Sequence, residues 1–348
     1  MAEAILAIPG DLATPTGGYA YDRRVLELLG SYGIAARALQ LPGSFPSPSA
    51  ADLDETVRRL AATPADATLV IDGLAFGAMP TTHLDRVGRR IVALVHHPLC
   101  LEAGLTPERA AILRRLETEA LSRASDVIVT SPAMARLLAS DFGVAAERIK
   151  VAEPGTDPAQ RATGTGTPLQ LLAVGAVSAR KGYDILVEAL APLGDLDWRL
   201  TIAGATDRAP EAVAELKSAI TRHRLGDKIT LAGTVVSATL ERFYASADLF
   251  LMPSLFEGYG MVLAEAMARG LPIVCTTGGA AAETVPDAAA IKVAPGDVEA
   301  LGRALVIAMS DRKVRARLAD AAWEAGRRLP TWNETARRIA AVILEIPA

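Results

Sequence analysis

One stretch of the chain, residues 255–274, reads LFEGYGMVLAEAMARGLPIV and decides the fold that we expect. A short apolar strand, DLFLMPS, leads into it, and a second strand, PIVCTT, begins at its end. Between the two strands, MVLAEAMARG has the apolar spacing of a helix that ends near Gly270, just before Pro272. A strand, a helix and a second strand in this order form a crossover unit, which places both strands parallel in one sheet.

The same alternation runs along the whole chain. The first half contains the expected strands AILAI, IAARALQ, ATLVIDG, RIVALVH and DVIVTS, and the second half contains LQLLAVG, RLTIAG, KITLAG, DLFLMPS, PIVCTT and AIKVA. Almost every residue in these runs is apolar, as in strands that are covered on both faces. We therefore expect an α/β protein with two Rossmann-like, doubly wound parallel sheets.

The junction between the two halves lies in residues 151–170, VAEPGTDPAQRATGTGTPLQ, which are rich in Pro, Gly and Thr and have no apolar period. We expect one domain over residues 1–155 and a second over residues 156–330. A long helical pattern follows the last strand and is broken near Pro330. The final helix, residues 331–348, has no obvious place to pack on the second sheet.

Composition excludes several classes of protein. The 348 residues carry a net charge of −4, which argues against a general nucleic-acid binder. Only two cysteines occur, and no Cys or His spacing is typical of zinc, so we expect no metal and a reducing, cytoplasmic setting. The chain shows neither a signal peptide nor an apolar run of membrane-spanning length. Peripheral contact with a membrane surface stays open.

The opening stretch also carries candidate binding residues. In parallel sheets, ligands bind beyond the carboxyl ends of the strands, and two facing sheets would form a cleft there. Gly258 and Gly260 let a ligand approach the start of the helix, whose free N–H groups attract anions. Glu265 could accept two hydrogen bonds from a ribose diol, and Glu257 could meet sugar hydroxyls. The alternative is that both glutamates are ordinary solvated residues.

Two cations stand at the end of another strand. In VGAVSARKGYDILVEAL, Arg180 and Lys181 follow the strand that ends at Gly175 and precede a helix. Adjacent cations in this place could clamp a diphosphate, and Arg can do so with two parallel hydrogen bonds. A solvated pair is the alternative, although cations are unfavourable at a helix start.

The first half offers weaker signals. Gly17 and Gly18 lie between the first strand and the first helix, where a plain turn explains them equally well. His96 and His97 end a strand and would face the same cleft, either as functional or as structural residues. Glu102 follows the pair and could reach an acceptor. Neither a dinucleotide fingerprint nor a P-loop is present, and a Ser/His/Asp arrangement is not evident.

Taken together, these segments resemble a known family. FEGYGMVLAEAMARGLPIV resembles the E-x7-E motif of retaining glycosyltransferase family 4, also called the group 1 glycosyl transferases. ARKGYDILVEAL is similar to the diphosphate segment of that family, and TGGY to its N-terminal glycine loop. The resemblance covers nearly the whole chain and is strongest over residues 169–305. One position departs from it, because Ala176 stands where the family often has Arg.

The resemblance implies a GT-B fold, in which the second domain holds a nucleotide sugar, the first holds the acceptor, and the last helix crosses back to the first domain. It implies that Glu265 holds the ribose, that Glu257 lies by the donor sugar, and that Arg180 and Lys181 bind the diphosphate. It further implies that His96 lies near the sugar. Other residues implied in substrate binding are Gly17, Gly18, His97, Glu102, Gly258, Tyr259, Gly260, Met261 and Val262.

The implied reaction is transfer of a hexosyl group, with retained configuration, from a UDP- or GDP-type sugar to a hydroxyl acceptor. The acceptor would be a glycan, a lipid or a small molecule, with no nucleic acid, metal or cofactor involved. The sequence leaves the oligomeric state open. Two alternatives also remain: a nucleotide-sugar 2-epimerase on the same architecture, and a non-catalytic subunit that binds nucleotide sugars. A dehydrogenase is disfavoured by the missing fingerprint.

Overall fold

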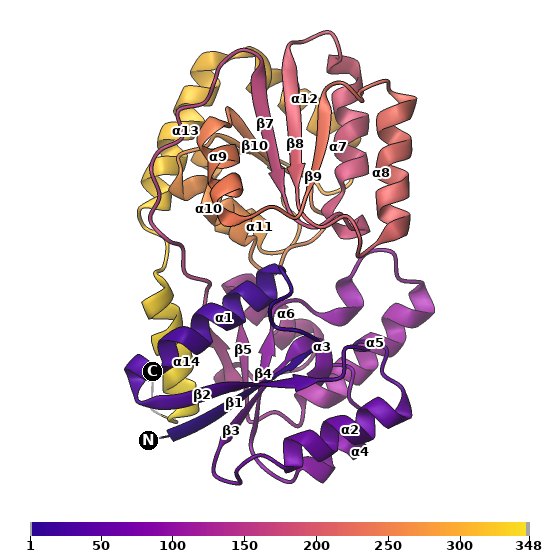
Figure 1. Cartoon of the computed structure of the whole chain (residues 1–348), viewed down its shortest axis with the longest axis vertical. Helices are drawn as coiled ribbons and strands as arrows, with labels where there is room; N and C mark the ends of the chain where they lie inside the picture. Colours follow the sequence, from indigo (N-terminus) through magenta and orange to yellow (C-terminus); the bar gives the residue numbers. More distant parts are fainter. Residues whose placement is uncertain (1, 346–348) are drawn as a thin grey trace. The chain divides into compact units, whose positions relative to one another are not determined.

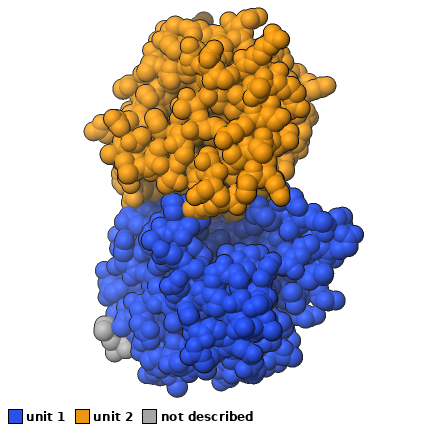
Figure 2. Space-filling view, turned by 45° about the vertical axis from the view of Figure 1, so that its right-hand side comes forward, with its two compact units in different colours: residues 1–155, 330–348 blue, residues 156–329 orange. Residues whose placement is uncertain are grey.

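The computed structural model of the protein describes residues 2–345 and divides the chain into two compact units. Unit 1 contains residues 1–155 and 330–348, and unit 2 contains residues 156–329, as coloured in Figure 2. Each unit is built around one parallel sheet, so the expected α/β class with two Rossmann-like domains is confirmed. In the part of the chain that is described, no helix is both long and apolar enough to cross a membrane.

The sheet of unit 1 has six parallel strands in the order β2-β1-β3-β4-β5-β6. All five strands expected in the first half are present, and the sequence missed a sixth, β6. This strand has only three residues, too few to show an apolar period. The strands are β1 Ala2–Pro9, β2 Ile34–Leu41, β3 Thr68–Asp72, β4 Ile91–Val95, β5 Asp126–Val129 and β6 Ile149–Val151.

Helices cover both faces of this sheet, which is why its central strands are apolar without alternation. Every residue of β4 is buried. In β1, Ala2 and Glu3 are partly exposed, and the residues from Ala4 to Pro9 are buried. The helices are α1 Gly17–Leu29, α2 Ala50–Ala61, α3 Gly73–Phe76, α4 Thr81–Leu84, α5 Pro107–Leu121, α6 Pro132–Asp141 and α14 Trp332–Ile343. Short 3-10 turns are η1 Gly30–Tyr32, η2 Asp85–Val87, η3 Leu99–Leu101 and η4 Ala146–Arg148.

The sheet of unit 2 also has six parallel strands, in the order β12-β11-β10-β7-β8-β9. All six strands expected in the second half are present. They are β7 Leu169–Val174, β8 Trp198–Ala203, β9 Ile229–Gly233, β10 Leu249–Met252, β11 Ile273–Thr276 and β12 Ala290–Val293. The helices and turns are η5 Ala179–Lys181, α7 Tyr183–Leu190, η6 Ala191–Leu193, α8 Pro210–Arg222, α9 Ser237–Ser246, α10 Met261–Ala268, α11 Ala281–Thr284, η7 Asp287–Ala289, α12 Val298–Ser310 and α13 Arg312–Gly326.

The helical pattern after β12 is divided in a place that the sequence did not indicate. It forms two helices, α12 and α13, that meet at Asp311. The Asp311 carboxylate accepts hydrogen bonds from the backbone N–H groups of Lys313 and Val314, so it caps the second helix. Neither Pro nor Gly marks this turn, and for that reason the sequence suggested one helix instead of two.

Each sheet reverses its winding at one pair of strands, and this fixes where functional residues gather. In unit 1 the strand that follows β1 is added on one side of the sheet, and the strands that follow β3 are added on the other side. In unit 2 the same reversal lies between β7 and β10. The helices that follow these strands lie on opposite faces, which opens a crevice at the carboxyl ends of the pair. The loops after β1 and β3, and after β7 and β10, are therefore the places to look for a site.

The last helix packs on unit 1, as Figure 1 shows for α14 beside α1. The Trp332 ring meets the ring of Tyr21 edge-on, with centroids 5.9 Å apart, and Arg24 covers it at 5.6 Å. The Thr335 hydroxyl donates a hydrogen bond of 2.6 Å to the carbonyl of Glu153. Gly155 has no room for a side chain, because a Cβ there would lie 2.2 Å from the Trp332 nitrogen.

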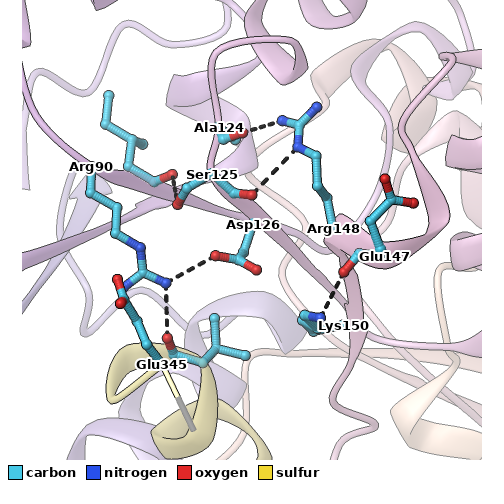
Figure 3. A network of polar contacts seen from close by, with 10 residues as sticks. Arg90, Ala124, Ser125, Asp126, Glu147, Arg148, Lys150 and Glu345 are labelled. Atoms are coloured by element: carbon cyan, nitrogen blue, oxygen red, sulfur yellow. Dashed lines mark hydrogen bonds and ion pairs between the residues drawn. The ribbon is translucent and has the colours of Figure 1, made fainter. Parts of the chain in front are cut away.

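A polar network fixes the other end of α14 to the sheet (Figure 3). The Arg90 guanidinium donates to the Asp126 carboxylate at 2.9 Å and to the Val342 carbonyl at 3.0 Å, and it pairs with Glu345 at 3.2 Å. Arg90 precedes β4 and Asp126 begins β5, so one side chain joins two strands to the helix. The final helix is thus an integral layer of unit 1.

Trp332→Ala tests the contribution of this layer. We expect a loss of about 3–5 kcal/mol in the free energy of unfolding of unit 1, because a nearly buried indole leaves a cavity against Tyr21. Urea unfolding together with amide hydrogen exchange over residues 332–343 measures the effect. Trp332→Phe is the matched control and should lose less than half as much. Unchanged exchange in the Ala variant would contradict the packing account.

Candidate functional site

Two loops meet at the winding reversal of unit 2. The loop after β7 contains η5 with Arg180 and Lys181, and the loop after β10 contains residues 253–260. The backbone N–H of Leu255 donates a 2.7 Å hydrogen bond to the carbonyl of Arg180, which ties the loops together. Gly182 follows with a φ of +60°, and a Cβ there would lie 2.6 Å from the Pro253 oxygen. Only glycine fits this close approach.

Glu257 lies between the two cations that the sequence singled out. Its Oε1 is 2.6 Å from the Lys181 Nζ and 3.3 Å from an Arg180 guanidinium nitrogen. The same guanidinium nitrogen also donates to the carbonyl of Phe256 at 2.7 Å. The three side chains are only 9–20% exposed, so their charges interact with little screening by water. The sequence indicated each of these residues but did not predict that they pair.

The charges of this group determine the state of Glu257. Burial would raise the pKa of the carboxyl, but the nearby Lys181 and Arg180 charges outweigh burial and lower it to about 2. The carboxylate therefore remains ionised at neutral pH, and the two cations and one anion leave a net charge of +1. A partly buried positive group at the carboxyl edge of a sheet can bind an anionic ligand.

Tight backbone packing holds the Glu257 loop. A Cβ on Gly278 would lie 2.3 Å from the Leu255 oxygen, and one on Gly279 would lie 2.4 Å from the Glu257 oxygen. Gly260 precedes α10 with a φ of +89°, a conformation that favours glycine. Gly258 and Tyr259 are buried in this turn, and Met261 and Val262 begin the helix partly exposed. The expected binding residues of this segment therefore all lie at the start of α10.

Glu265 lies in the second turn of α10 and is held by the end of α9. The buried Tyr244 hydroxyl donates a 2.7 Å hydrogen bond to Glu265 Oε2. The Arg269 guanidinium lies 4.4 Å from the Tyr244 ring centroid and donates to the Glu265 carbonyl at 2.9 Å. Burial raises the pKa of Glu265, and the Tyr244 hydrogen bond and the Arg269 charge oppose it. This is not a freely solvated glutamate, so that alternative is wrong.

Tyr244 was missed because an aromatic residue near the end of an amphipathic helix is usually a core residue. Its ring does belong to the core, where it stacks on Phe250 with centroids 5.9 Å apart. Only the partner of its hydroxyl reveals a second role. A buried tyrosine hydroxyl generally needs a hydrogen-bond partner, and here that partner is a carboxylate chosen independently from the sequence.

A second group of polar side chains lies at the winding reversal of unit 1. His96 follows β4, Asp72 ends β3, and Asp22 lies on α1. The His96 Nε2 is 3.1 Å from Asp22 Oδ1 and 3.7 Å from Asp72 Oδ2. The sequence identified His96 but neither aspartate. Asp72 could have been found, because it ends a buried strand, but Asp22 lies inside a predicted helix and carries no such signal.

The glycine pair belongs to the same group. Gly17 and Gly18 begin α1, whose N-cap Thr16 accepts a hydrogen bond from the Tyr19 N–H at 3.1 Å. A Cβ on Gly18 would lie 3.2 Å from the His96 ring. Gly18 therefore lets the helix approach the imidazole closely, which is a packing reason for a glycine that the sequence left as a possible plain turn.

Charge and burial shape the titration of this group. Burial and the Asp22 charge raise the pKa of Asp72 to about 7, and the His96 charge opposes them. For His96 burial would lower the pKa, but the two aspartates outweigh burial and raise it. One ligand atom from each residue falls within 4.8 Å of the others, a spacing that could also hold a metal ion. The sequence did not indicate this grouping, because its members are far apart along the chain.

His97 and Glu102 lie in the segment after β4. The His97 Nε2 is 3.5 Å from Glu102 Oε2, and the Glu102 side chain is 43% exposed. Beneath them, the buried Glu117 of α5 accepts a 2.9 Å hydrogen bond from the Leu99 N–H. Among the described residues, Glu117 Oε1 has no hydrogen-bond partner. Burial raises the pKa of Glu117 to about 8, with the Leu99 hydrogen bond opposing.

Glu117→Gln should therefore change stability in a pH-dependent way. A carboxyl whose pKa rises from 4.5 to about 8 on folding stabilises the protein only while it is protonated. Wild type should lose about 1.4 kcal/mol for each pH unit between about 4.5 and 8 relative to the variant. Urea unfolding at pH 4.5, 6 and 8 measures this difference. A difference that stays constant with pH would show that Glu117 does not titrate on unfolding.

Two family descriptions match consecutive parts of the chain. Residues 14–160 match Glycosyltransferase Family 4, and residues 158–324 match Glycosyl transferases group 1. The chain belongs to family 4 of the glycosyltransferases, the group 1 glycosyl transferases. The resemblance inferred from the E-x7-E segment, the ARKGY segment and the glycine loop is thereby confirmed.

Curated relatives of this family 4 chain are identical to it at about three in ten of the aligned residues. The mannosylfructose-phosphate synthase of Agrobacterium fabrum is 28% identical over 236 residues, or 62% of this chain and 52% of the relative. The D-inositol 3-phosphate glycosyltransferase of Xylanimonas cellulosilytica is 32% identical over 242 residues, or 64% of this chain and 58% of the relative. The chain thus spans between half and three fifths of the length of these relatives.

Solved structures establish the GT-B fold of this family 4 chain. The sucrose-phosphate synthase of Thermosynechococcus elongatus superposes with a TM-score of 0.82, at 20% identity and 99% coverage of both chains. The HepE protein of Anabaena in complex with UDP-glucose superposes with a TM-score of 0.78, at 20% identity, covering 98% of this chain and 99% of that one.

Proposed function

We propose that the protein is a retaining glycosyltransferase. It transfers a hexosyl group from a nucleoside diphosphate sugar to a hydroxyl acceptor, and it does so without a metal ion or a cofactor. Unit 2 holds the donor, and unit 1 binds the acceptor, which is a hydroxyl of a glycan, a lipid or a small molecule. The observation that carries the proposal is the partly buried group of Glu257, Arg180 and Lys181 at the β7/β10 reversal of a family 4 chain.

Support for a nucleotide-sugar donor comes from that charge. A diphosphate carries two or more negative charges, and the group offers one positive charge in a partly buried setting. The N–H groups at the start of α10 add the partial positive charge of a helix end. A structure of the Anabaena neighbour was determined with UDP-glucose. Arg180 stands here in place of the family's Arg at Ala176 and supplies one of the two phosphate-binding cations.

Support for the ribose role of Glu265 comes from its surroundings. The Tyr244 hydroxyl donates one hydrogen bond to the Glu265 carboxylate and thereby fixes its orientation. The other acceptor sites of the carboxylate remain available to a ligand. A ribose diol presents two hydroxyl donors, and a carboxylate can accept both. Because the Tyr244 hydroxyl already restricts the rotamers of the Glu265 side chain in the free protein, less side-chain entropy is lost when the ligand binds.

In the transfer step, negative charge grows on the departing diphosphate and must be stabilised. The bond between the sugar C1 and the diphosphate oxygen breaks, and the acceptor oxygen bonds to C1 on the same face. The hydroxyl proton moves to the departing phosphate oxygen, so atoms and charge balance. Arg180 and Lys181 stabilise the negative charge that grows on the diphosphate as the bond breaks. Holding donor and acceptor together supplies the rest of the rate enhancement.

Glu257 is unsuited to be the general base in this scheme. A carboxylate with a pKa of about 2 is a weak proton acceptor near neutral pH. It is also already bound to Lys181 at 2.6 Å, so it keeps the cation in place instead of attacking the sugar. A leaving diphosphate that takes the acceptor proton removes the need for such a base.

Turnover with a panel of donors tests the proposal. Purified protein is incubated in EDTA with UDP-glucose, UDP-galactose, GDP-mannose and ADP-glucose, with and without a mixture of sugar and polyol acceptors. We expect one donor to release its nucleoside diphosphate in an acceptor-dependent way, and NMR of the product to show a retained anomeric configuration. An inverted product, strict metal dependence, an epimerised sugar without acceptor, or no turnover of a donor that binds would each contradict the proposal.

A further inference from the structure

Asp22 and Asp72 are buried carboxyl groups that the proposed transfer does not use. Asp22 is fully buried and Asp72 is 3% exposed, yet both direct an oxygen at the same imidazole nitrogen, Nε2 of His96. Carboxyl groups with so little exposure are rare unless they have a partner. The partner here is a histidine whose side chain is 20% exposed, so the group connects the interior of unit 1 with its surface.

The geometry allows only a few charge states. If both carboxyl groups were ionised beside a neutral imidazole, two buried negative charges would face each other without compensation. Protonation of both ring nitrogens removes that conflict, because the imidazole then carries a positive charge and its Nε2–H can donate to Asp22 Oδ1 at 3.1 Å and attract Asp72 Oδ2 at 3.7 Å. Asp72 is itself fixed, since its Oδ1 accepts the Leu74 N–H at 2.7 Å. Among the described residues, Asp22 Oδ2 has no hydrogen-bond partner, so His96 is the side chain that compensates the buried Asp22 carboxylate.

The packing around the ring supports one orientation. The Tyr21 ring meets the imidazole edge-on at 5.2 Å, with an interplanar angle of 81°. Gly18 lies on another side, where a Cβ would come within 3.2 Å of the imidazole Cδ2. Turning the ring over would move Nε2 away from both carboxyl groups. The ionisable groups that face His96 are Asp22 and Tyr21 from α1 and Asp72 from β3.

We propose that Asp22 and Asp72 are positioning residues for His96. Asp22 holds the ring in one orientation by accepting a hydrogen bond from Nε2–H, Asp72 attracts the same N–H electrostatically from 3.7 Å, and together they keep that proton on the ring through neutral pH. Only Nδ1 and the exposed ring edge then remain for contact with a substrate. The effect of this arrangement on turnover rests on the proposed glycosyl transfer, but the state of the ring does not.

Nitrogen-15 NMR tests the state of the ring directly. The chain has four histidines, His83, His96, His97 and His223, so His96→Gln assigns the resonances. We expect His96 to keep Nε2 protonated through neutral pH and to titrate above the usual pKa of a histidine, which is about 6.5. A neutral ring protonated on Nδ1, or titration at or below the usual pKa of a histidine, would overturn the proposal in the wild-type protein alone, before any aspartate is changed.

Asp22→Asn and Asp72→Asn test the cause. Each removes one negative charge and keeps the side-chain shape, so the pH at which His96 titrates should fall by about one unit or more, with the larger fall for Asp22. Asp141→Asn, an exposed carboxylate of unit 1, is the control and should leave His96 unchanged. No change in either test variant would overturn the proposal. Broadening of the His96 signals by Zn²⁺, reversed by EDTA, would indicate a metal site instead and would also overturn it.

Activity separates this inference from the proposed function. If a donor is turned over, the limb of the kcat/KM–pH profile that depends on His96 should move to lower pH in Asp22→Asn, which a merely structural role would not cause. If no donor is turned over, the proposed function fails while the NMR result still decides the role of the two aspartates. The two failures can therefore be told apart.

Discussion

Lys181→Met should reduce kcat for donor turnover by about a hundredfold or more. Lys181 is 13% exposed and lies 2.6 Å from Glu257, so its charge acts where water screens little. Removing the charge takes away stabilisation of the departing diphosphate and leaves Glu257 facing Arg180 alone at 3.3 Å. Donor affinity should fall as well. Steady-state release of nucleoside diphosphate at saturating donor measures kcat, and calorimetry measures affinity.

Unit 2 contains a closely matched control. Lys292 lies on β12, is 12% exposed, and also pairs with a carboxylate, Asp287, at 2.6 Å. It differs from Lys181 in its place, since it is not at the β7/β10 reversal, and in its partner, since Asp287 is 95% exposed and Glu257 only 9%. Lys292→Met should leave kcat within about twofold, because only a charge near the reacting phosphate enters the transition state. Equal losses in the two variants would mean that kcat reports general damage to unit 2.

Glu265→Gln should weaken nucleotide binding by about ten- to a hundredfold, since a hydrogen bond to a charged group contributes about 1.5–3 kcal/mol. The loss should depend on the ribose: 2′,3′-dideoxynucleotide should bind wild type and variant with the same affinity. Tyr244→Phe should show a smaller loss with the same dependence, because the carboxylate remains but its 2.7 Å hydrogen bond is gone. Isothermal titration calorimetry of the three proteins with both nucleotides measures all six affinities.

Glu241→Gln serves as the control for this region. Glu241 is 59% exposed and pairs with Arg269, which itself covers the Tyr244 ring. The change removes a carboxylate from the neighbourhood but keeps Glu265 and its hydrogen bond from Tyr244, so nucleotide affinity should stay within about twofold. An equal loss with dideoxynucleotide in Glu265→Gln would show that the residue acts through the fold and not through the ribose.

Much of the fold could be predicted because the central strands of both sheets are buried on both faces. Eleven of the twelve strands appear in the sequence as apolar runs, and the exception is β6, with three residues. The division of the last helical pattern at Asp311 was not predicted, since neither Pro nor Gly marks it and the cap is a single carboxylate. Local signals thus determine which segments form elements, and capping determines where some of them end.

The functional groups were predicted singly but not as groups. Arg180, Lys181 and Glu257 were each chosen because they follow strands, yet their pairing depends on β7 and β10 being neighbours. Asp22 and Asp72 are separated from His96 by 74 and 24 positions, and only the order β1-β3-β4 brings all three to one place. Contacts set by strand order cannot be derived from composition or from apolar period alone.

Nucleotide binding in the absence of metal is the most direct test of the central claim that unit 2 holds a nucleoside diphosphate. The protein is unfolded thermally in EDTA with UDP, GDP, ADP or dTDP, alongside Lys181→Met and Glu265→Gln. One nucleotide should stabilise the wild type by about 2.7 kcal/mol at 100 times its Kd, and the shift should shrink in both variants. If no nucleotide stabilises the wild type, or if the shift survives unchanged in both variants, the donor site is not where we place it.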